Sequence, residues 1–462
     1  MKNKYLSTVD SAKTLALNCF SHLSHYDDRV VKRVIQVAHA RNLAPQKKFS
    51  EVFSTPADRK AGYRLIENDT LVPDQLISSI RIAGKEKISS LNPKTIVVPQ
   101  DSTWFTMPEN RHVRGLGKVS DSRMRGFSLH TALGLSLEGV PQCILDIQHY
   151  IRSFEKPKKN RTHREIEEKE SFRWLSTANE VINMLPDETS VIFVSDRESD
   201  IYDYISFLKS KEASFVIRVQ HNRRVEGEEK YLVETVCHSK PLGRITLTIP
   251  KAHNRSERVV RATIQTTEVI LHLRKGGPKI HRDRQPISLR VLRVVEDPGE
   301  NVKDPVDWFL YTDQTIQTLS QAKEIIRIYT LRWRIEEFHL TLKSGMGVED
   351  QRFESVEAIL RWIYLSAPMA VKLLEIMLGS RESPKCTVSG ILSESEIEAT
   401  RLIIKRQTGR LPRKVTAEMV VKHIAFLGGW MGRRNDGPPG IRTFWKGWRQ
   451  MQFLAQMLGE TN

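Results

Sequence analysis

The sequence contains few cysteines, and they show no pattern of a metal site or a disulfide framework. The four lie far apart and form no Cys-x2-Cys or Cys/His spacing: Cys19, Cys143, Cys237 and Cys386. Structural zinc sites need such spacings, and disulfide-stapled domains are short and dense in cysteine. Both are therefore excluded, and a reducing cytoplasm is the expected compartment.

A long, uninterrupted hydrophobic run is also missing. The most apolar stretch, WIYLSAPMAVKLLEIMLG, is interrupted by Pro368, Lys372 and Glu375. A membrane-spanning helix needs about 20 consecutive, mainly apolar residues. The opening residues, MKNKYLSTVD, lack the apolar centre of a signal peptide. We therefore expect a buried core helix at this stretch and no membrane partner.

Acidic residues are too few to balance the basic ones. Lys and Arg number 72 against 55 Asp and Glu, which leaves a net charge of +17. An excess of this size favours a polyanionic partner, because cations that neutralise phosphates release condensed counterions. The sequence has no P-loop, so no nucleotide cofactor is expected. With 39% hydrophobic and 27% charged residues, the chain has the composition of a folded globular protein.

The order of sequence patterns predicts an α/β protein with a helical module at each end. Residues 1–75 have the pattern of a basic helical module, and residues 372–462 are helical again. Between them, residues 76–371 contain short β-branched runs followed by helical periodicity, which is typical of buried strands in an α/β sheet. An alternating segment at about 236–300, rich in Thr, Val and Ile, predicts an all-β insertion.

Two of the β-branched runs end in an aspartate. KTIVVPQ is followed by Asp101, and SVIFVS is followed by Asp196, where the chain passes directly into a helix. Reactive groups collect at the strand ends of an open sheet, so the two carboxylates can meet. An aspartate after a strand is also a common turn former or helix cap. Position alone leaves both roles open.

The segment YTLRWRIEEFHLTLKSG, residues 329–345, predicts one helix with an unusual polar stripe. At 3.6 residues per turn, its polar side chains fall within an arc of about 60°; they are Tyr329, Arg332, Glu336 and Lys343. Glu337 points about 100° away from Glu336. A solvated helix face with Glu/Lys pairs is the simpler interpretation. If Glu336 meets the two aspartates, three carboxylates repel unless cations such as Mg²⁺ or Mn²⁺ lie among them.

This segment resembles the Tyr-x2-Arg-x3-Glu-x6-Lys signature of DDE transposases of the IS-four family, especially the transposon-five-like branch. All four signature residues match without a gap. VSDRESDIYDY resembles the second-Asp motif of that family and VVPQDSTWF the first-Asp strand. RGFSLH, EKESFRWL, FVIR, LGGWM and FWKGW are also similar, so the resemblance extends over nearly the whole chain.

The resemblance implies an RNase H-like mixed-sheet catalytic core with a β insertion, a helical end-binding N-terminal domain and a dimerising C-terminal domain. It implies that Asp101, Asp196 and Glu336 are catalytic and hold Mg²⁺ or Mn²⁺, with two ions per active site. It assigns DNA contacts to Tyr329, Arg332, Lys343, Arg218 and Arg33. Trp308 matches a tryptophan that stacks on a flipped base, and a buried core tryptophan is its alternative.

The function implied is that of a cut-and-paste DNA transposase, which cleaves terminal inverted repeats through a hairpin intermediate and joins the ends to target DNA. A homodimer in the synaptic complex and a bacterial cytoplasm, in association with the nucleoid, are further expectations. Two alternatives remain. One is a catalytically idle relative that acts as a DNA-binding repressor, which the loss of any of the three carboxylates would favour. The other is a structure-selective nuclease of the same fold.

Overall fold

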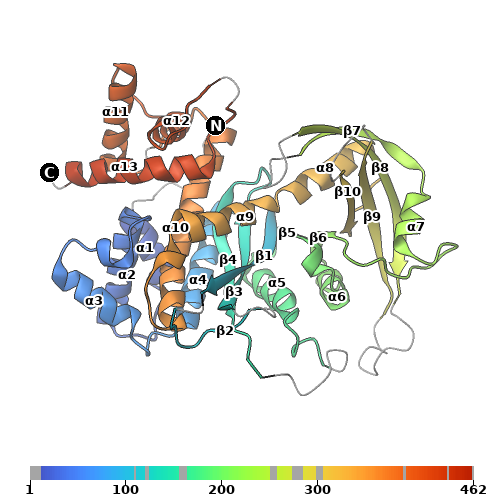
Figure 1. Ribbon diagram of the computed structural model, residues 1–462. Helices are drawn as coiled ribbons and strands as arrows, with labels where there is room; N and C mark the ends of the chain where they lie inside the picture. Colours follow the sequence, from blue (N-terminus) through green and yellow to red (C-terminus); the bar gives the residue numbers. More distant parts are fainter. Residues whose placement is uncertain are drawn as a thin grey trace.

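A ten-stranded mixed sheet forms the centre of the computed structural model, and helices cover both of its faces (Figure 1). The structure describes residues 12–108, 111–119, 124–155, 164–249, 258–272, 285–297, 305–388, 392–433 and 436–459. The strands are β1 (Thr95–Met107), β2 (Gly117–Lys118), β3 (Arg125–Leu135), β4 (Pro141–Tyr150), β5 (Ser190–Ser195), β6 (Ser214–Arg218), β7 (Pro241–Ile249), β8 (Arg258–Leu271), β9 (Ile287–Glu296) and β10 (Asp307–Thr312).

The strand order separates a parallel centre from two antiparallel wings. The order is β2-β3-β1-β5-β6-β10-β9-β8-β7, with β4 paired to β3. Strands β1, β5 and β6 run parallel, whereas β3 is antiparallel to β1 and to β4. The mixed α/β sheet expected from the sequence is therefore present.

The predicted β insertion forms strands, but they extend the central sheet. Strand β10 pairs with β6 on one side and with β9 on the other, and β9 leads on to β8 and β7. Short stretches of the predicted segment, 250–257, 273–284 and 298–300, lie outside the described residues. Hydrogen-bond pairing through β10 thus joins the insertion to the strands that carry the candidate site.

Two layers of helices cover the two faces of the sheet because successive strand residues point in opposite directions. Val97, Ile192 and Val194 pack into one core, and Val98 and Phe193 pack into the other. The first face is covered by α8 (Leu319–Thr330), α9 (Trp333–Leu340) and α10 (Val356–Glu382). The second face is covered by α5 (Phe172–Met184), α6 (Tyr202–Ser210) and α7 (Leu232–Cys237).

The apolar stretch at 362–379 lies in α10, the one helix of the described chain that is long and apolar enough to cross a membrane. Its apolar window is fully buried inside the protein. Pro368 stands within the helix, and Lys372 and Glu375 are buried with it. Glu375 lies 3.6 Å from the ammonium of Lys87, so this charge has a partner. The helix is a core element, as the interrupted sequence predicts.

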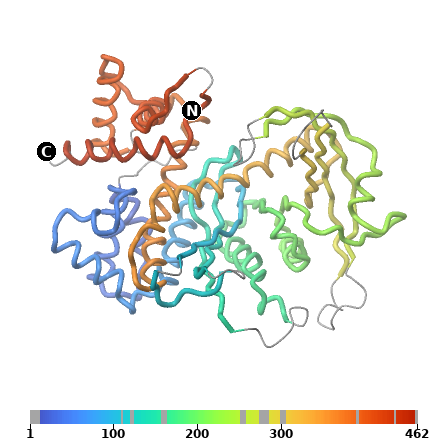
Figure 2. The backbone as a smooth tube through the Cα atoms, in the orientation of Figure 1, coloured from blue at the N-terminus to red at the C-terminus, as the bar shows by residue number. Residues whose placement is uncertain are grey.

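Helices at both chain ends pack beside α10 (Figure 2). The N-terminal helices are α1 (Ala12–Phe20), α2 (Asp28–Leu43), α3 (Pro56–Ile66) and α4 (Pro73–Leu91). The C-terminal helices are α11 (Glu394–Thr408), α12 (Ala417–Leu427) and α13 (Ile441–Gly459). The predicted boundaries after residues 75 and 371 fall inside α4 and α10, and residues 1–11 lie outside the described chain. The division into three domains stays a prediction.

The expected single helix over residues 329–345 is wrong. Helix α8 ends at Thr330, a tight turn follows at Leu331 and Arg332, and α9 begins at Trp333. Thr341–Gly345 then form a wider π-helical turn, closed by a 2.8 Å bond from Met346 N to Thr341 O. Tertiary packing accounts for both breaks, because Leu331 packs against the β3–β4 turn and Gly345 packs against the ring of Trp445.

Candidate active site

The sheet register places Asp101 and Asp196 next to each other. The last aligned pair of the parallel strands β1 and β5 is Pro99 with Val194, and each aspartate follows two residues later. Neighbouring strands lie about 4.8 Å apart. Beyond Pro99, β1 pairs only with β3, so the two strands separate at the aspartates. The two aspartates thus follow the last paired residues of neighbouring strands, and their role as a catalytic pair stays a prediction.

Asp101 experiences the negative charge of both other carboxylates. Its side chain is 15% exposed, and its Oδ1 accepts a 2.7 Å hydrogen bond from the backbone N–H of Ser102. Burial raises the pKa of Asp101 to about 7, with a further contribution from Asp196 and a smaller one from Glu336. Arg332 and the Ser102 bond oppose this shift without cancelling it. The three predicted residues therefore share one electrostatic site.

Asp196 has the structural role that the sequence left open. Its Oδ1 accepts a 2.9 Å bond from the N–H of Glu198 and so caps the short turn Arg197–Ser199. A cap uses acceptor capacity of one oxygen, and an ionised carboxylate has four lone-pair sites. Capping and catalysis are therefore compatible at this position.

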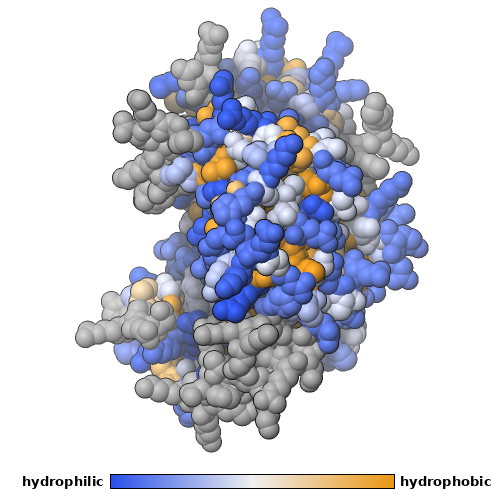
Figure 3. Space-filling view, turned by 90° about the vertical axis from the view of Figure 1, so that its right-hand side faces the viewer, coloured by the Kyte–Doolittle hydropathy of each residue, from blue (hydrophilic) through white to orange (hydrophobic). Residues whose placement is uncertain are grey.

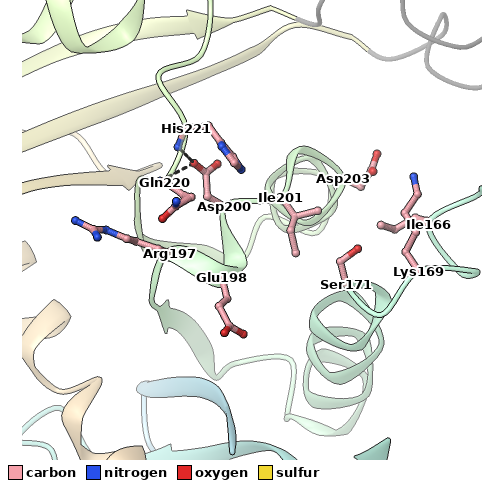
Figure 4. A pocket seen from close by; sticks show the side chains of 10 residues that line it. All are labelled: Ile166, Lys169, Ser171, Arg197, Glu198, Asp200, Ile201, Asp203, Gln220 and His221. Atoms are coloured by element: carbon pink, nitrogen blue, oxygen red, sulfur yellow. Dashed lines mark hydrogen bonds between the residues drawn. The ribbon is translucent and has the colours of Figure 1, made fainter. Parts of the chain in front are cut away.

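A buried ion pair holds the turn that carries Asp196. Asp200 accepts 2.8 Å bonds from the N–H groups of Gln220 and His221, which follow β6 (Figure 4). Its carboxylate also binds the guanidinium of Arg223 at 2.6 Å. Residues of both turns line a cavity of about 600 Å³ beside this site. The pair thus ties the ends of β5 and β6 together next to Asp196.

Arg332 connects Glu336 to Asp101. Its guanidinium lies 2.6 Å from Glu336 Oε1 and 3.8 Å from Asp101 Oδ2. Burial alone would lower the pKa of Arg332, but Glu336, together with Tyr329 and Asp101, raises it above its usual value. The buried Nε of Arg332 has no hydrogen-bond partner among the described residues. A donor thus remains for an anionic ligand beside the carboxylates.

Glu337 lies outside this group, as its helical phase predicts. Its carboxylate pairs with Arg334, three residues earlier on α9, at 2.9 Å. Glu336 is half exposed and Glu337 about a third exposed, so burial does not separate the two. Their ion-pair partners distinguish them, because Glu336 pairs with Arg332 and Glu337 pairs with Arg334.

Tyr329, Arg218 and Trp308 form one aromatic and cationic cluster. The Trp308 ring lies 5.4 Å from that of Tyr329 and 6.2 Å from that of Trp333, and the Arg218 guanidinium lies 5.9 Å from it. Burial lowers the pKa of Arg218, whereas Tyr329 opposes the shift by charge and by a hydrogen bond. Trp308 is only 6% exposed and belongs to the core. This burial favours the packing alternative in the DNA-free protein, and base stacking stays a prediction.

Lys343 and Arg33 lie elsewhere. The Lys343 ammonium donates to Trp104 O at 2.6 Å, lies 3.1 Å from Glu349 Oε1 and lies 5.1 Å from the Phe105 ring. It is therefore placed along β1, beyond Asp101. Arg33 belongs to the N-terminal helices, where it pairs with Asp58 at 3.4 Å.

The donor set suits a hard divalent cation. Among the described residues, no group of three or more His, Cys, Asp or Glu side chains lies close enough to form a ready-made metal site. Mg²⁺ usually binds only one or two carboxylates and keeps several waters. Asp101 and Asp196 fit that requirement, and the raised pKa of Asp101 shows negative charge that a cation would neutralise. Glu336 instead faces Arg332.

The sequence analysis missed two residues of this region. His339, one turn after Glu336, lies 3.4 Å from the hydroxyl of Thr131, which stands opposite Asp101 on β3. Burial lowers the pKa of His339 to about 3, so it is a neutral packing group at working pH. Trp333 joins the Trp308 cluster. His339 and Trp333 each lie three residues from Glu336 in the sequence, and this helical spacing could have predicted that they lie near it.

Comparisons with known proteins found a similar solved structure and a matching family model. The chain aligns with a cryo-EM structure of a piggyBac transposase synaptic complex with hairpin DNA at 10% identity and a TM-score of 0.36, over 82% of this chain and 75% of that one. Residues 175–370 match the family model of the transposase DDE domain. That matched stretch contains Asp196 and Glu336, whereas Asp101 lies outside it.

Proposed function

We propose that this protein is a DNA transposase of the cut-and-paste type that cleaves and joins DNA at one carboxylate site. The observation that carries the proposal is the convergence of Asp101, Asp196 and Glu336, which register, charge and the Arg332 bridge bring together from distant parts of the chain. Asp196 and Glu336 lie within the matched DDE domain. The IS-four motifs in the sequence support the finer assignment.

The sheet supports an RNase H-like core within this proposal. The strands β4-β3-β1-β5-β6 form a continuous half of the sheet, with antiparallel strands on one side of β1 and parallel strands on the other. Asp101 and Asp196 lie just beyond the point where the parallel pairing of β1 with β5 ends. This is where reactive groups of such sheets gather.

The roles of the site residues follow from their charges and contacts. Asp101, Asp196 and Glu336 would hold Mg²⁺ or Mn²⁺, two ions per site. Such ions activate a water and stabilise the leaving oxygen in phosphodiester cleavage. Arg332, with its free buried Nε, would bind a DNA phosphate beside the carboxylates. Lys343 and Tyr329 would hold the adjoining backbone.

One site could serve the whole reaction. A water attacks a phosphodiester at the element end and releases a 3′-OH. That hydroxyl attacks the opposite strand and leaves a hairpin, which a second water opens. The freed 3′-OH then attacks target DNA. Each step is an in-line displacement at phosphorus that forms one P–O bond and breaks another, so the same residues serve each in turn.

Two copies of the chain and two element ends are part of this proposal. The IS-four resemblance supports a homodimer that binds terminal inverted repeats, and a bacterial cytoplasm as its location. The net charge of +17 supports a DNA partner.

The products of a DNA cleavage assay test the proposal. An end-labelled duplex that carries the inverted repeat flanking the gene is incubated with the protein in Mg²⁺, in Ca²⁺ and in excess chelator. We expect nicks, hairpins and double-strand breaks in Mg²⁺, and binding without cleavage in Ca²⁺, whose larger coordination shell misplaces the nucleophile. Full cleavage in chelator would refute the metal-dependent mechanism. Binding without cleavage in every ion would identify a repressor instead.

A further inference from the structure

Strand β1 presents a continuous face that runs from the candidate active site to the far end of the strand. Alternate residues of a strand point to the same side. Asp101, Phe105 and Met107 therefore share one face, and Phe105 and Met107 belong to the core beneath α9 and α10. On the partner strand β3, Arg125 stands opposite Met107 and points to that same face.

Cations accompany this face at successive positions. The Arg332 guanidinium lies at Asp101, the Lys343 ammonium lies over the Phe105 ring, and the Arg111 guanidinium contacts the Met107 sulfur at 3.2 Å. Residues two apart on a strand are separated by about 6.6 Å. The three strand positions are four and two residues apart, so they are separated by about 13 Å and about 7 Å, or roughly two phosphate steps and one along a DNA strand.

The row ends in a cavity of about 770 Å³ that is rich in arginine. Arg111, Arg114 and Arg125 line it together with His112, and Glu354 is the one acidic residue in its lining. Arg114 and Arg125 are exposed at its mouth. The Arg125 guanidinium lies 5.5 Å from the Phe154 ring, which orients the side chain without neutralising it.

The wall of this cavity is held in place by backbone bonds to the start of α10. The N–H of Arg114 donates to Glu354 O at 2.8 Å, and the N–H of Val356 donates to Arg114 O at 2.9 Å. Gly115 has φ +81°, and a Cβ there would lie 2.7 Å from the Val356 side chain. Arg111 also donates to Glu349 O at 3.1 Å. The cationic groups are therefore presented by a fixed loop.

Neighbouring acids offset only part of this charge. Glu349 pairs with Lys343, and Asp350 acts on Arg111. Burial and the nearby Arg352 lower the pKa of Arg111, which is the expected effect of excess positive charge. Within the part of the chain that the structure describes, neither Arg114 nor Arg125 forms an ion pair with Glu349 or Asp350, and both are exposed. An anion at the cavity would relieve the repulsion among these groups.

We propose that this row and its cavity bind the backbone of the DNA duplex whose scissile phosphate lies at the carboxylates. The inference rests on the proposed function and extends it by a DNA path. Six residues separate Asp101 from Met107, or about 20 Å, which is about six base pairs of duplex. Arg114 and Arg125 thus contact phosphates about six base pairs from the cleaved bond.

The test combines a double variant with shortened DNA. Arg114→Gln/Arg125→Gln is compared with the wild type and with Lys209→Gln, which removes an exposed cation from α6 on the opposite face of the sheet. The probe is a labelled duplex carrying the gene-flanking inverted repeat, whole or trimmed to four base pairs beyond the scissile phosphate on either side. Affinity is measured over a salt series in Ca²⁺, and thermal unfolding verifies the fold.

We expect the double variant to bind the whole duplex roughly tenfold more weakly, with the slope of log affinity against log salt reduced by about one to two. On one of the two trimmed duplexes, the double variant and the wild type should bind equally. Lys209→Gln should match the wild type throughout. The proposed DNA path would be contradicted if the double variant kept wild-type affinity and salt slope on the whole duplex. It would also be contradicted if the double variant bound both trimmed duplexes more weakly than the wild type. Wild-type cleavage of the same duplex in Mg²⁺ separately reports the proposed function.

Discussion

The ionised form of Asp101 is destabilised in the folded protein. Its pKa rises from 3.8 to about 7, so between these values the folded state binds more protons than the unfolded state. The free energy of unfolding therefore falls as pH rises through this window, and the ionised form is a burden above it. One pKa unit corresponds to about 1.4 kcal/mol, so the burden is at most a few kcal/mol.

Asp101→Asn should therefore stabilise the metal-free protein. The neutral amide keeps the side-chain shape, and we expect the free energy of unfolding at pH 8 to increase by roughly 1–4 kcal/mol. Near pH 4 the difference should vanish, because wild-type Asp101 is then protonated. Thermal unfolding in chelator at both pH values measures this. A lower Tm for Asp101→Asn at pH 8 would contradict the charge interpretation.

Substitutions of Trp308 distinguish a packing role from a base-stacking role. Because it is buried against Tyr329 and Trp333, Trp308→Ala should cost about 3–5 kcal/mol of stability. Trp308→Phe keeps much of the packing and a smaller ring face. If Trp308 receives a flipped base, this variant should slow hairpin formation more than the first nick, and nicked DNA should accumulate. A wild-type ratio of nick to hairpin on denaturing gels would leave Trp308 with a packing role.

At the scale of elements, local periodicity predicts only what lies within one turn of helix. The pair Arg332 and Glu336 is four residues apart, and it forms as expected. Lys343 was placed on the same stripe, but the π-helical turn moves it to β1, at Trp104 and Phe105. No pattern in residues 329–345 shows the partners, Gly139 and Trp445, that break the helix.

The strands illustrate the same limit. Alternation predicted the insertion strands, and apolar runs predicted the strands before Asp101 and Asp196, although β1 continues beyond Asp101 to Met107. The pairing of β10 with β6, which attaches the insertion to the central strands, joins segments about 90 residues apart. Sequence periodicity carries no information on such partners, so the extension of the sheet could not be foreseen.

Gly345, at the end of the π-helical turn after α9, packs against the C-terminal helix α13. A Cβ at this position would lie 2.5 Å from the Trp445 ring of α13. Gly345→Ala should therefore destabilise the protein by roughly 1–3 kcal/mol through overpacking. Adding Trp445→Leu, which shortens the opposing side chain, should recover part of that loss. A double-mutant cycle by chemical denaturation measures the coupling, and strictly additive effects would show that the two residues do not interact.

At the scale of the molecule, Arg41 ties the N-terminal helices to the core. It is fully buried, and its guanidinium donates to Ser366 Oγ at 2.9 Å, Lys47 O at 3.0 Å and Met346 O at 2.7 Å. It also lies 4.4 Å from the Trp362 ring, and burial lowers its pKa to about 9. The basic N-terminal helices are therefore part of the same packed body as α10.

Arg41→Met should destabilise the whole protein, because it leaves two buried carbonyls without a donor. We expect a loss of about 2–4 kcal/mol. The matched control is Arg33→Met on the same helix, where the ion pair with Asp58 is partly exposed and worth at most about 1 kcal/mol. Chemical denaturation compares the two. Equal losses of unfolding free energy in the two variants would contradict the role of Arg41 in joining the N-terminal helices to the core.

The net charge was predictable from composition, but its placement was not. The face shown in Figure 3 is largely hydrophilic, with a few separate hydrophobic patches. The cations beside β1 come from segments more than 200 residues apart, Arg111 and Lys343 among them. Only the fold brings them to the end of one strand, next to the carboxylates.

The most direct measurement of the central claim is DNA strand cleavage by single carboxylate variants. Asp101→Asn, Asp196→Asn, Glu336→Gln and the control Glu337→Gln are incubated in Mg²⁺ with an end-labelled duplex that carries the gene-flanking inverted repeat, and affinity is measured in parallel. We predict that the first three abolish cleavage while binding persists, and that Glu337→Gln, whose partner is Arg334, cleaves normally. Normal cleavage by Glu336→Gln, or loss of cleavage in Glu337→Gln alone, would contradict the assigned site.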